Sequence, residues 1–438
     1  MKRIWVIGVT VVLVSISAWL LVGRLGGCRG QDLNTRIGTR QTYAPTTAET
    51  FAAVEDWPKW RGPRGDGISR ESVGESWPKE GLKRLWVADV GIGFSSPIAV
   101  GDRLYLFSLN NGKDNLSCFN ANTGELIWSD ESASGWTKDY EGTRATPAIA
   151  DGRIFTYGGM GEVVCRDLGT GKPIWKQNAL DLVGGETPQW GTASSPLVHD
   201  QKVIVQAGGG ASIAVALDVG TGALVWKSEA TGAGSYAHPI VVDVEGTKQL
   251  VVFAADAVVG MSPQTGATLW RETWNTSYGV NSTTPVYRDG HLYVSSAYGM
   301  GGMMLKLSPT GAQKLWAKKD IKSKFQGLVL EGDMLIGNSD PGSLIAIKWP
   351  TGDRMWKADD SALNPGMGGS IVKAAGDKMI VMSEEGTLSL SKVSPEGIQL
   401  ISQFPAFDDV RQVWSTPLLY AGRLYAKGPK ELVCFELP

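Results

Sequence analysis

The sequence predicts an all-β protein, an eight-bladed β-propeller whose blades are four-stranded antiparallel sheets. Three observations lead to this prediction. A phrase that ends in tryptophan recurs along most of the chain, two strand signals precede each copy, and the chain ends carry complementary halves of one more copy. Repeats of roughly 40–50 residues made of short strands are typical of propeller blades.

The recurring phrase reads CFNANTGELIW in one clear copy, which ends at Trp128. Six further copies, one of them truncated, end at Trp86, Trp175, Trp226, Trp270, Trp316 and Trp356. Successive tryptophans are 42, 47, 51, 44, 46 and 40 residues apart, and an eighth, divergent copy ends at Ile401. Because this residue recurs in nearly every unit, we expect the tryptophan to pack between blades rather than to stack on a ligand.

The middle of the phrase has the chemistry of a tight turn. Asn120, Asp167 and Asp218 each stand three residues before a Thr-Gly pair. A short polar side chain at that position can cap the turn, and the glycine can adopt the positive φ that the turn requires. The phrase is therefore predicted to form the last two strands of a blade.

Two short hydrophobic stretches separated by a turn precede each phrase. In the first unit, PIAV and LYLF flank a Gly-Asp turn within residues 97–107. Such runs of Val, Ile, Leu and Tyr bounded by turn residues predict hairpin strands. Eight openings of this kind occur along the chain, which gives four strands per unit and eight units.

The chain ends predict how the ring closes. Residues 434–438 resemble the first half of the phrase, and GLKRLW, which ends at Trp86, resembles its second half. We therefore expect one blade to be shared by N- and C-terminal strands, which removes an exposed edge. The predicted propeller spans residues 85–438.

The first 30 residues are predicted to anchor the protein in a membrane. Lys2 and Arg3 precede 20 residues without charge, enough to span a bilayer. The basic residues place the propeller on the periplasmic side of the inner membrane. Residues 25–28 resemble a lipoprotein cleavage box, so attachment through Cys28 is the alternative, although Arg24 interrupts the apolar run. Residues 31–56 are expected to be a flexible linker, and the Trp-, Gly- and Pro-rich residues 57–84 to pack on the propeller.

Composition limits the function classes. The net charge of −2 gives no electrostatic argument for nucleic-acid binding. Cys118, Cys165 and Cys434 occupy equivalent positions in different blades, too far apart for disulfide bonds, so we expect buried, unpaired thiols. The sequence contains no recognisable metal-ligand cluster, phosphate loop or nucleophile elbow. We therefore expect no metal site and no catalytic residues.

The phrase, read as A-x-D-x-x-T-G-x-x-x-W, resembles the tryptophan-docking repeat of the pyrroloquinoline-quinone (PQQ) propeller superfamily, over about residues 85–438. One branch holds PQQ and calcium on the ring axis. The other consists of cofactor-free propellers similar to BamB, which bind proteins. The chain lacks the adjacent cysteines of quinoprotein alcohol dehydrogenases and their long insertions, and it is closer in character to the BamB-like branch. That resemblance implies a monomeric, membrane-tethered scaffold that binds envelope proteins through its rim and loops, with no cofactor. The alternative is a propeller that binds PQQ and Ca²⁺, or another small ligand, and acts as an oxidoreductase.

Any ligand is expected at the ring axis, where the loops that precede the first strand of each blade converge. These loops carry aromatic, amide and charged side chains, which suit a planar or sugar-like ligand. The candidate site residues are Arg144, Trp190, Tyr236, Tyr278, Asn281, Gln326 and Trp414, with His238, Glu141, Asp409 and Arg411 nearby. The competing interpretation is that polar strand ends and aromatic rings simply fill the taper of the channel. No convincing acid/base pair stands among these residues.

Overall fold

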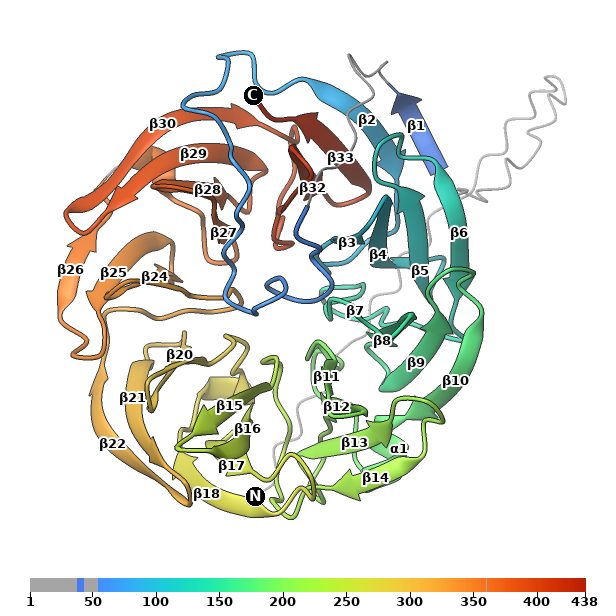
Figure 1. Cartoon of the computed structure of the whole chain (residues 1–438), viewed down its shortest axis with the longest axis vertical. Helices are drawn as coiled ribbons and strands as arrows, with labels where there is room; N and C mark the ends of the chain where they lie inside the picture. The colour runs from blue at the N-terminus through green and yellow to red at the C-terminus, as the bar shows by residue number, and fades with distance from the viewer. Residues whose placement is uncertain (1–37, 43–53, 360) are drawn as a thin grey trace, which may run out of the picture. The chain divides into compact units, whose positions relative to one another are not determined.

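The computed structural model describes residues 38–42, 54–359 and 361–438 and confirms the predicted ring of eight antiparallel sheets (Figure 1). Seven sheets have four strands, and the eighth has a fifth strand at its outer edge. In every blade the strands follow one another outward from the ring centre, so the first strand of each blade faces the axis (Figure 1).

The first four blades contain sixteen strands in chain order. Blade 1 consists of β3 (Ile98–Val100), β4 (Arg103–Asn110), β5 (Lys113–Asn120) and β6 (Leu126–Glu131). Blade 2 consists of β7 (Ala148–Ala150), β8 (Arg153–Tyr157), β9 (Glu162–Asp167) and β10 (Pro173–Asn178). Blade 3 consists of β11 (Leu197–His199), β12 (Lys202–Gln206), β13 (Ala214–Asp218) and β14 (Leu224–Lys227). Blade 4 consists of β15 (Ile240–Val244), β16 (Thr247–Phe253), β17 (Ala257–Met261) and β18 (Thr268–Thr273).

The next three blades repeat the pattern. Blade 5 consists of β19 (Val286–Arg288), β20 (His291–Ser296), β21 (Gly301–Ser308) and β22 (Gly311–Lys318). Blade 6 consists of β23 (Val329–Glu331), β24 (Met334–Ser339), β25 (Ser343–Lys348) and β26 (Arg354–Lys357). Blade 7 consists of β27 (Ser370–Lys373), β28 (Lys378–Met382), β29 (Thr387–Ser394) and β30 (Gly397–Pro405), and it contains the divergent eighth phrase. The described helices are short: α1 (Ala179–Val183) and the 3-10 turns η1 (Ser277–Gly279) and η2 (Ser361–Leu363).

Blade 8 closes the ring in the predicted way. Its inner strands β31 (Leu418–Tyr420), β32 (Arg423–Lys427) and β33 (Glu431–Glu436) come from the C-terminus, and β2 (Arg84–Asp89) comes from the N-terminal side. Trp86 of β2 stands opposite Cys434 of β33 in the antiparallel register. Strand β1 (Gly38–Thr42) adds to the outer edge of β2. Of the expected linker over residues 31–56, the structure therefore describes one strand and residues 54–56, and the remainder lies outside the described residues.

The tryptophans of most phrases dock on a glycine of the next blade, as the repeat predicts. A side chain on Gly124 of blade 1 would place its Cβ 2.6 Å from the Trp86 ring, and Trp86 Nε1 donates a hydrogen bond to the Ala121 carbonyl (3.0 Å). The same relation joins Trp175 to Gly222 in the following blade. Gly124 has a φ of 72°, which a side chain would strain. The repeated tryptophans are thus part of the blade interfaces.

Residues 54–78 cross the centre of the ring before the chain enters β2 (Figure 1). Trp57 and Ala99 of blade 1 exchange two backbone hydrogen bonds, of 2.8 and 3.0 Å. Further along the segment, the Ser69 amide donates to the carbonyl of Lys373 in blade 7 (2.8 Å). This crossing segment therefore ties separate blades together and brings Trp60 to the axis.

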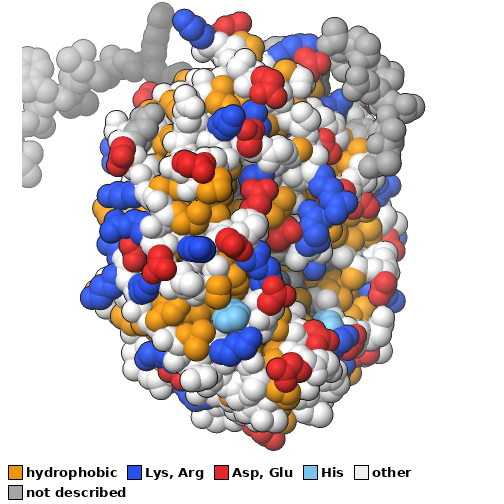
Figure 2. Space-filling view, turned by 60° about the vertical axis from the view of Figure 1, so that its left-hand side comes forward, with side chains coloured by type: hydrophobic (Ala, Val, Ile, Leu, Met, Phe, Trp, Pro, Cys, Tyr) orange, Lys and Arg blue, Asp and Glu red, His pale blue; other side chains and the backbone are white. Residues whose placement is uncertain are grey.

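Cys118, Cys165 and Cys434 are buried and unpaired, as expected. Figure 2 shows hydrophobic side chains interspersed with charged ones on the side of the ring turned to the viewer. Within the ranges that the structure describes, none of the helices is both long and apolar enough to cross a bilayer. The anchor predicted for residues 1–30, with Cys28, lies outside those ranges.

Candidate functional site

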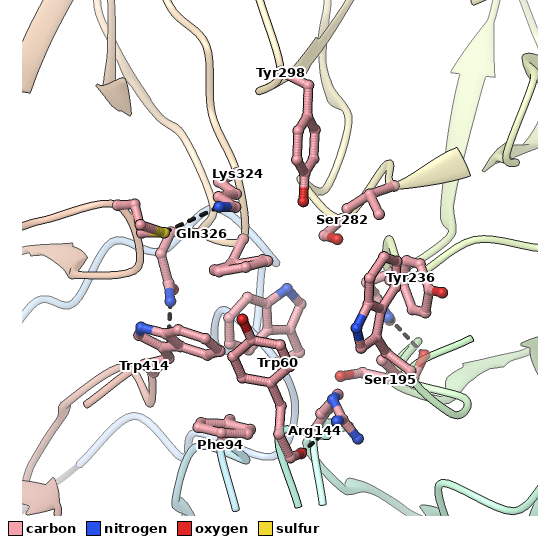
Figure 3. Close-up of a pocket in the computed structure, with 17 residues that line it drawn as sticks. Trp60, Phe94, Arg144, Ser195, Tyr236, Ser282, Tyr298, Lys324, Gln326 and Trp414 are labelled. Atoms are coloured by element: carbon pink, nitrogen blue, oxygen red, sulfur yellow. Dashed lines mark hydrogen bonds between the residues drawn. The ribbon is translucent and has the colours of Figure 1, made fainter. Parts of the chain in front are cut away.

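A cavity of about 190 Å³ lies on the ring axis (Figure 3). Each of the eight loops that precede an inner strand contributes to its wall, because the strands converge on the axis and leave their preceding loops around one mouth. The crossing segment contributes Trp60, which lies at the centre of the view in Figure 3. The lining residues are Trp60, Phe94, Tyr140, Arg144, Trp190, Ala193, Ser195, Tyr236, His238, Val280, Ser282, Tyr298, Lys324, Phe325, Gln326, Met367 and Trp414.

Aromatic rings form two clusters around this cavity. In the first, Trp414 stacks on Phe94 and meets Phe325 at a tilt, with ring centroids 4.7 Å apart in both pairs, and Tyr140 lies 5.5 Å away. We call these four residues the Trp414 cluster. In the second, Trp190 meets the rings of Tyr236 and Tyr278 at 6.1 and 6.0 Å, and Tyr278 meets Tyr298 at 5.9 Å. We call these the Trp190 cluster.

Two cationic side chains stand among the rings. The guanidinium of Arg144 lies 5.9 Å from the Phe94 ring centre and donates hydrogen bonds to the carbonyls of Gly142 (3.1 Å), Asp139 (3.2 Å) and Tyr140. Burial lowers the pKa of Arg144 to about 10, partly offset by the nearby Tyr236 and Asp114, so it remains protonated at neutral pH.

Lys324 is the second cation, and it lies between the two clusters. Its ammonium group is 5.2 Å from the centre of the Tyr298 ring and 5.3 Å from that of Phe325. It donates to the Met367 sulfur at 3.0 Å, which is a weak acceptor. Among the described residues, neither Lys324 nor Arg144 forms an ion pair, and no carboxylate lines the cavity. The site is therefore aromatic and positively charged.

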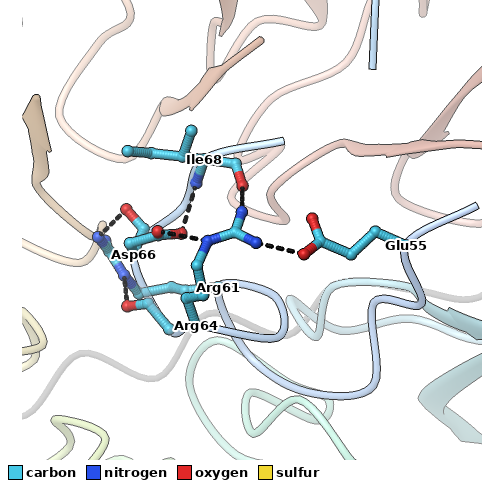
Figure 4. A network of polar contacts seen from close by, with 6 residues as sticks. Glu55, Arg61, Arg64, Asp66 and Ile68 are labelled. Carbon is cyan, nitrogen blue, oxygen red and sulfur yellow. Dashed lines mark hydrogen bonds and ion pairs between the residues drawn. The ribbon is translucent and has the colours of Figure 1, made fainter. Parts of the chain in front are cut away.

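The crossing segment fixes Trp60 on the axis. Trp60 Nε1 donates to Thr284 Oγ1 of blade 5 at 2.9 Å. The next residue, Arg61, donates to the carbonyls of Gly65 (3.0 Å), Asp66 (2.7 Å) and Leu328, and the last of these belongs to blade 6. Figure 4 shows this network, in which Arg64 pairs with Glu55 and Asp66. Trp60 is thus held by a folded loop whose own contacts reach two blades.

His238 lines the cavity but is poorly suited to be a base. Its Nδ1 lies 2.9 Å from the Ser195 carbonyl oxygen, which can only accept, so Nδ1 carries the hydrogen. Burial lowers the pKa of His238 to about 4, although the hydrogen bond to Ser195 opposes the shift. An imidazole with this pKa is neutral at pH 7 and is a weaker proton acceptor than one with a pKa near the working pH.

The residues predicted for the site have different positions in the structure. Arg144, Trp190, Tyr236, Gln326 and Trp414 line the cavity, as does His238. Tyr278 and Asn281 do not line it, and neither does the exposed Asp409.

Tyr278 lies beside Trp190 with 70% of its surface exposed and does not line the cavity. Asn281 is fully buried, and its amide donates to the Ala254 carbonyl (2.7 Å) while its oxygen accepts from Ser296 Oγ (2.6 Å). The Gln326 side chain also has structural partners, since it donates to the Gly368 and Trp414 carbonyls at 2.9 and 2.7 Å.

Several lining residues were missed by the reasoning from sequence. Trp60 was assigned only to a packing segment, and nothing in its local pattern indicates that the segment crosses the axis. Lys324 and Phe325 lie in the loop IKSKFQG, directly before Gln326, so their position next to a predicted residue was an available signal. Tyr298 lies in the turn between β20 and β21, and such turns were not considered as part of the mouth.

A second cavity, of about 540 Å³, adjoins the first and shares Phe94, Tyr140 and Trp414 with it. Glu141 and Arg411, which the sequence placed near the site, line this second cavity. Lys427 does too, and burial lowers its pKa to about 7. Its ammonium group donates to the carbonyls of Gly93 (2.7 Å) and Gly428 (3.0 Å).

The axial cavity does not suit a quinone held by calcium. Calcium takes six to eight oxygen ligands, usually with several carboxylates. The cavity lining contains no Asp or Glu, and Asn281, one of the predicted site residues, has its side chain bonded within the protein. Among the described residues, no group of three or more His, Cys, Asp or Glu side chains is placed to hold a metal ion.

Comparison with known proteins identifies relatives in both branches. The family model described as outer membrane protein assembly factor BamB matches residues 114–358. The assembly factor BamB of Yersinia pestis is 26% identical over 214 residues, 48% of this chain and 50% of that protein. The lanthanide-dependent methanol dehydrogenase of Methylacidiphilum fumariolicum (strain SolV) is 35% identical over 89 residues, 19% of this chain and 14% of that protein. The matches thus span half or less of the length of these relatives.

Solved structures resemble the whole propeller. BamB from Moraxella catarrhalis has a TM-score of 0.57 and 17% identity, covering 81% of this chain and 97% of that chain. A europium-containing methanol dehydrogenase has a TM-score of 0.65 and 13% identity, covering 87% of this chain and 98% of that chain. At these identities the likeness establishes the fold alone.

Proposed function

We propose, starting from the fact that this chain belongs to the family described as outer membrane protein assembly factor BamB, that it is a protein-binding scaffold of the cell envelope. In this proposal residues 1–30 tether it to the inner membrane and the propeller faces the periplasm as a monomer. The observation that carries the proposal is the family match over residues 114–358, more than half of the chain.

The chemistry of the axial cavity supports binding rather than catalysis. Its lining combines aromatic rings with two cations, which are good at holding a partner by stacking and charge. Acid–base catalysis needs a group with a pKa near the working pH. His238, the histidine in the lining, has a pKa of about 4, and no carboxylate accompanies it there.

The outer rim supports protein contacts as well. Exposed aliphatic side chains stand directly before the docked tryptophans on several outer strands, including Ile127 of β6, Ile174 of β10 and Val225 of β14, which are 44–47% exposed. Outer strands also have a free backbone edge that can pair with another strand. Strand β1 already occupies that edge in blade 8, which illustrates the pairing.

Site-specific photo-crosslinking in native membranes tests the scaffold. A photoreactive residue is placed at Tyr278 beside the mouth, at Ile174 on the rim, and at Asp289, an exposed turn residue, as the matched control. We expect discrete adducts with envelope proteins from the mouth or the rim that are absent from the control position. Identical adducts from all three positions, or none, would contradict the scaffold.

The second candidate is a small-ligand-binding propeller, in its strongest form a PQQ-dependent oxidoreductase. The aromatic cavity favours a small ligand in general, and the short match to a methanol dehydrogenase is what favours the PQQ-dependent form. Addition of PQQ with Ca²⁺ or a lanthanide to the purified chain tests it. Stoichiometric quinone absorbance together with dye-linked alcohol oxidation would establish this candidate and overturn the scaffold as the main function.

A further inference from the structure

The two aromatic clusters leave a slot for a flat molecule. Within each cluster the rings contact one another, at 4.7–5.5 Å around Trp414 and 5.9–6.1 Å around Trp190, and the space between the clusters remains open. Trp60 also lines this space and lies at the centre of the view in Figure 3. A cavity of about 150 Å³ accepts benzene in another protein, so about 190 Å³ suits a molecule with one or two fused rings.

The charges around the slot favour an anion. Arg144 donates hydrogen bonds to backbone carbonyls, and Lys324 donates one to a thioether. Among the described residues, neither cation is hydrogen-bonded to a carboxylate. Each cation also lies over the face of an aromatic ring, which shields one side of the charged group from bulk water. A hydrogen bond from either cation to a carboxylate would join two charged groups and would be stronger than its bonds to the neutral acceptors named above.

Two other ligand classes fit less well. Aromatic cages often bind quaternary ammonium groups, but here Arg144 and Lys324 would repel a cation. A neutral sugar would need free amide or carboxylate partners. The Gln326 amide is already bonded to the Gly368 and Trp414 carbonyls, and no Asp or Glu lines the slot.

We propose that the axial slot binds a flat aromatic carboxylate, with its rings between the Trp190 and Trp414 clusters and its carboxylate beside Lys324, and that no metal ion takes part. Arg144, on the loop before blade 2, adds positive charge from the other side of the axis (Figure 3). This site is separate from the scaffold proposal, since a propeller can bind proteins through its rim whether or not the slot is occupied.

Isothermal titration of the purified full chain with 2-naphthoate, in the presence of EDTA, measures the site. The matched probes are 2-naphthamide, which has the same rings without the charge, and 2-naphthyltrimethylammonium, which carries the opposite charge. We expect 2-naphthoate to bind one molecule per chain, at least about tenfold more tightly than the amide, with the cation weaker still. EDTA should not change the affinity.

Variants locate the binding. Lys324→Met keeps the length of the side chain and its contact surface but removes the charge, and we expect it to weaken 2-naphthoate about tenfold while leaving 2-naphthamide unchanged. Trp190→Ala should weaken both probes, because both use the ring contacts. Lys176→Met, on the outer strand β10, is the control for loss of a lysine and should change neither.

Three outcomes would overturn the proposal: no binding of 2-naphthoate at millimolar concentration, equal affinity for the acid and the amide, or tighter binding of the cation. Retention of full affinity in Lys324→Met would overturn the assigned position of the carboxylate. Thermal unfolding of each variant shows whether it is folded. The crosslinking experiment is independent, so failure of the slot and failure of the scaffold are distinguishable.

Discussion

The ammonium group of Lys324 lies 5.2 Å from the centre of the Tyr298 ring, and its hydrogen bond goes to the sulfur of Met367. This cation therefore rests on an aromatic face at the mouth of the axial slot and forms no ion pair among the described residues. A positive charge placed in this way supports the proposed anion site over a channel that side chains merely fill.

The two tryptophans that give the aromatic clusters their names should differ in their effect on stability. Trp414 donates to Glu384 Oε2 (3.1 Å) and packs so closely on Gly368 that an added Cβ there would lie 2.1 Å from the indole. Both tryptophans are half-buried, but among the described residues the Trp190 indole donates no hydrogen bond of this kind. In urea denaturation, Trp414→Ala should cost roughly 2–4 kcal/mol and Trp190→Ala about 1 kcal/mol or less. Equal costs would contradict the assignment of Trp190 to ligand contact.

Gly124→Ala tests the docking of one blade on the next. A Cβ at Gly124 would lie 2.6 Å from the Trp86 ring, whereas a Cβ at Gly152 would meet no atom within 4 Å. Both glycines have a positive φ, of 72° and 69°, so both substitutions incur backbone strain of about 1 kcal/mol. We expect Gly124→Ala to cost a further 1–3 kcal/mol or so, measured as the free energy of unfolding. Similar losses at the two sites would show that the Trp86 contact is not tight.

The crossing segment predicts a contrast between two neighbouring arginines. Arg61 is half-buried and donates to three carbonyls, including that of the buried Leu328 in blade 6, whereas Arg64 is exposed and pairs with Glu55 and Asp66. Arg61→Met should destabilise the fold by roughly 2–4 kcal/mol, because three carbonyls lose a charged donor. Arg64→Met should cost about 1 kcal/mol or less. A larger loss of stability in Arg64→Met than in Arg61→Met would mean that the segment does not stabilise the ring.

Asp114 predicts a pH dependence of stability. Burial raises its pKa from 3.8 to about 7, only partly opposed by the Gly159 amide and by Arg144 and Arg166. The folded state therefore binds a proton that the unfolded state has lost, so stability falls as the pH rises from about 4 to 7.

Asp114→Asn should remove that dependence. Between pH 5 and pH 7, we expect the wild type to lose roughly 2 kcal/mol relative to the variant in its free energy of unfolding. Parallel curves for the two proteins would show that Asp114 is ionised in the folded protein throughout this range.

The fold could be predicted from the sequence because its determinants are local and repeated. The Asn120 side chain accepts from the Thr123 amide at 3.1 Å, and Asp167 and Asp218 do the same for Thr170 and Thr221 at 2.8 Å. These turns lie next to the glycines on which the tryptophans dock. Eight units and a shared blade follow from counting such signals, with no knowledge of distant contacts.

The site could be predicted only in part, because it depends on contacts distant in sequence. The loops before the inner strands were identified as a group, and most of the predicted residues on them line the cavity. Asn281 belongs to the same loops, yet its amide bonds inward to Ala254 and Ser296, and the sequence does not reveal that direction. Trp60 reaches the axis through bonds to Thr284 and through its neighbour Arg61, and both contacts are more than 200 residues away.

The most direct test of the central claim is a reversal of ligand charge in the slot. The affinities of the wild type and of Lys324→Glu for 2-naphthoate and for 2-naphthyltrimethylammonium are measured by titration calorimetry. If the slot is an anion site, the wild type prefers the carboxylate, and the variant loses that preference by about 100-fold or reverses it. An unchanged preference in the variant, or a wild type that prefers the ammonium compound, would contradict the account.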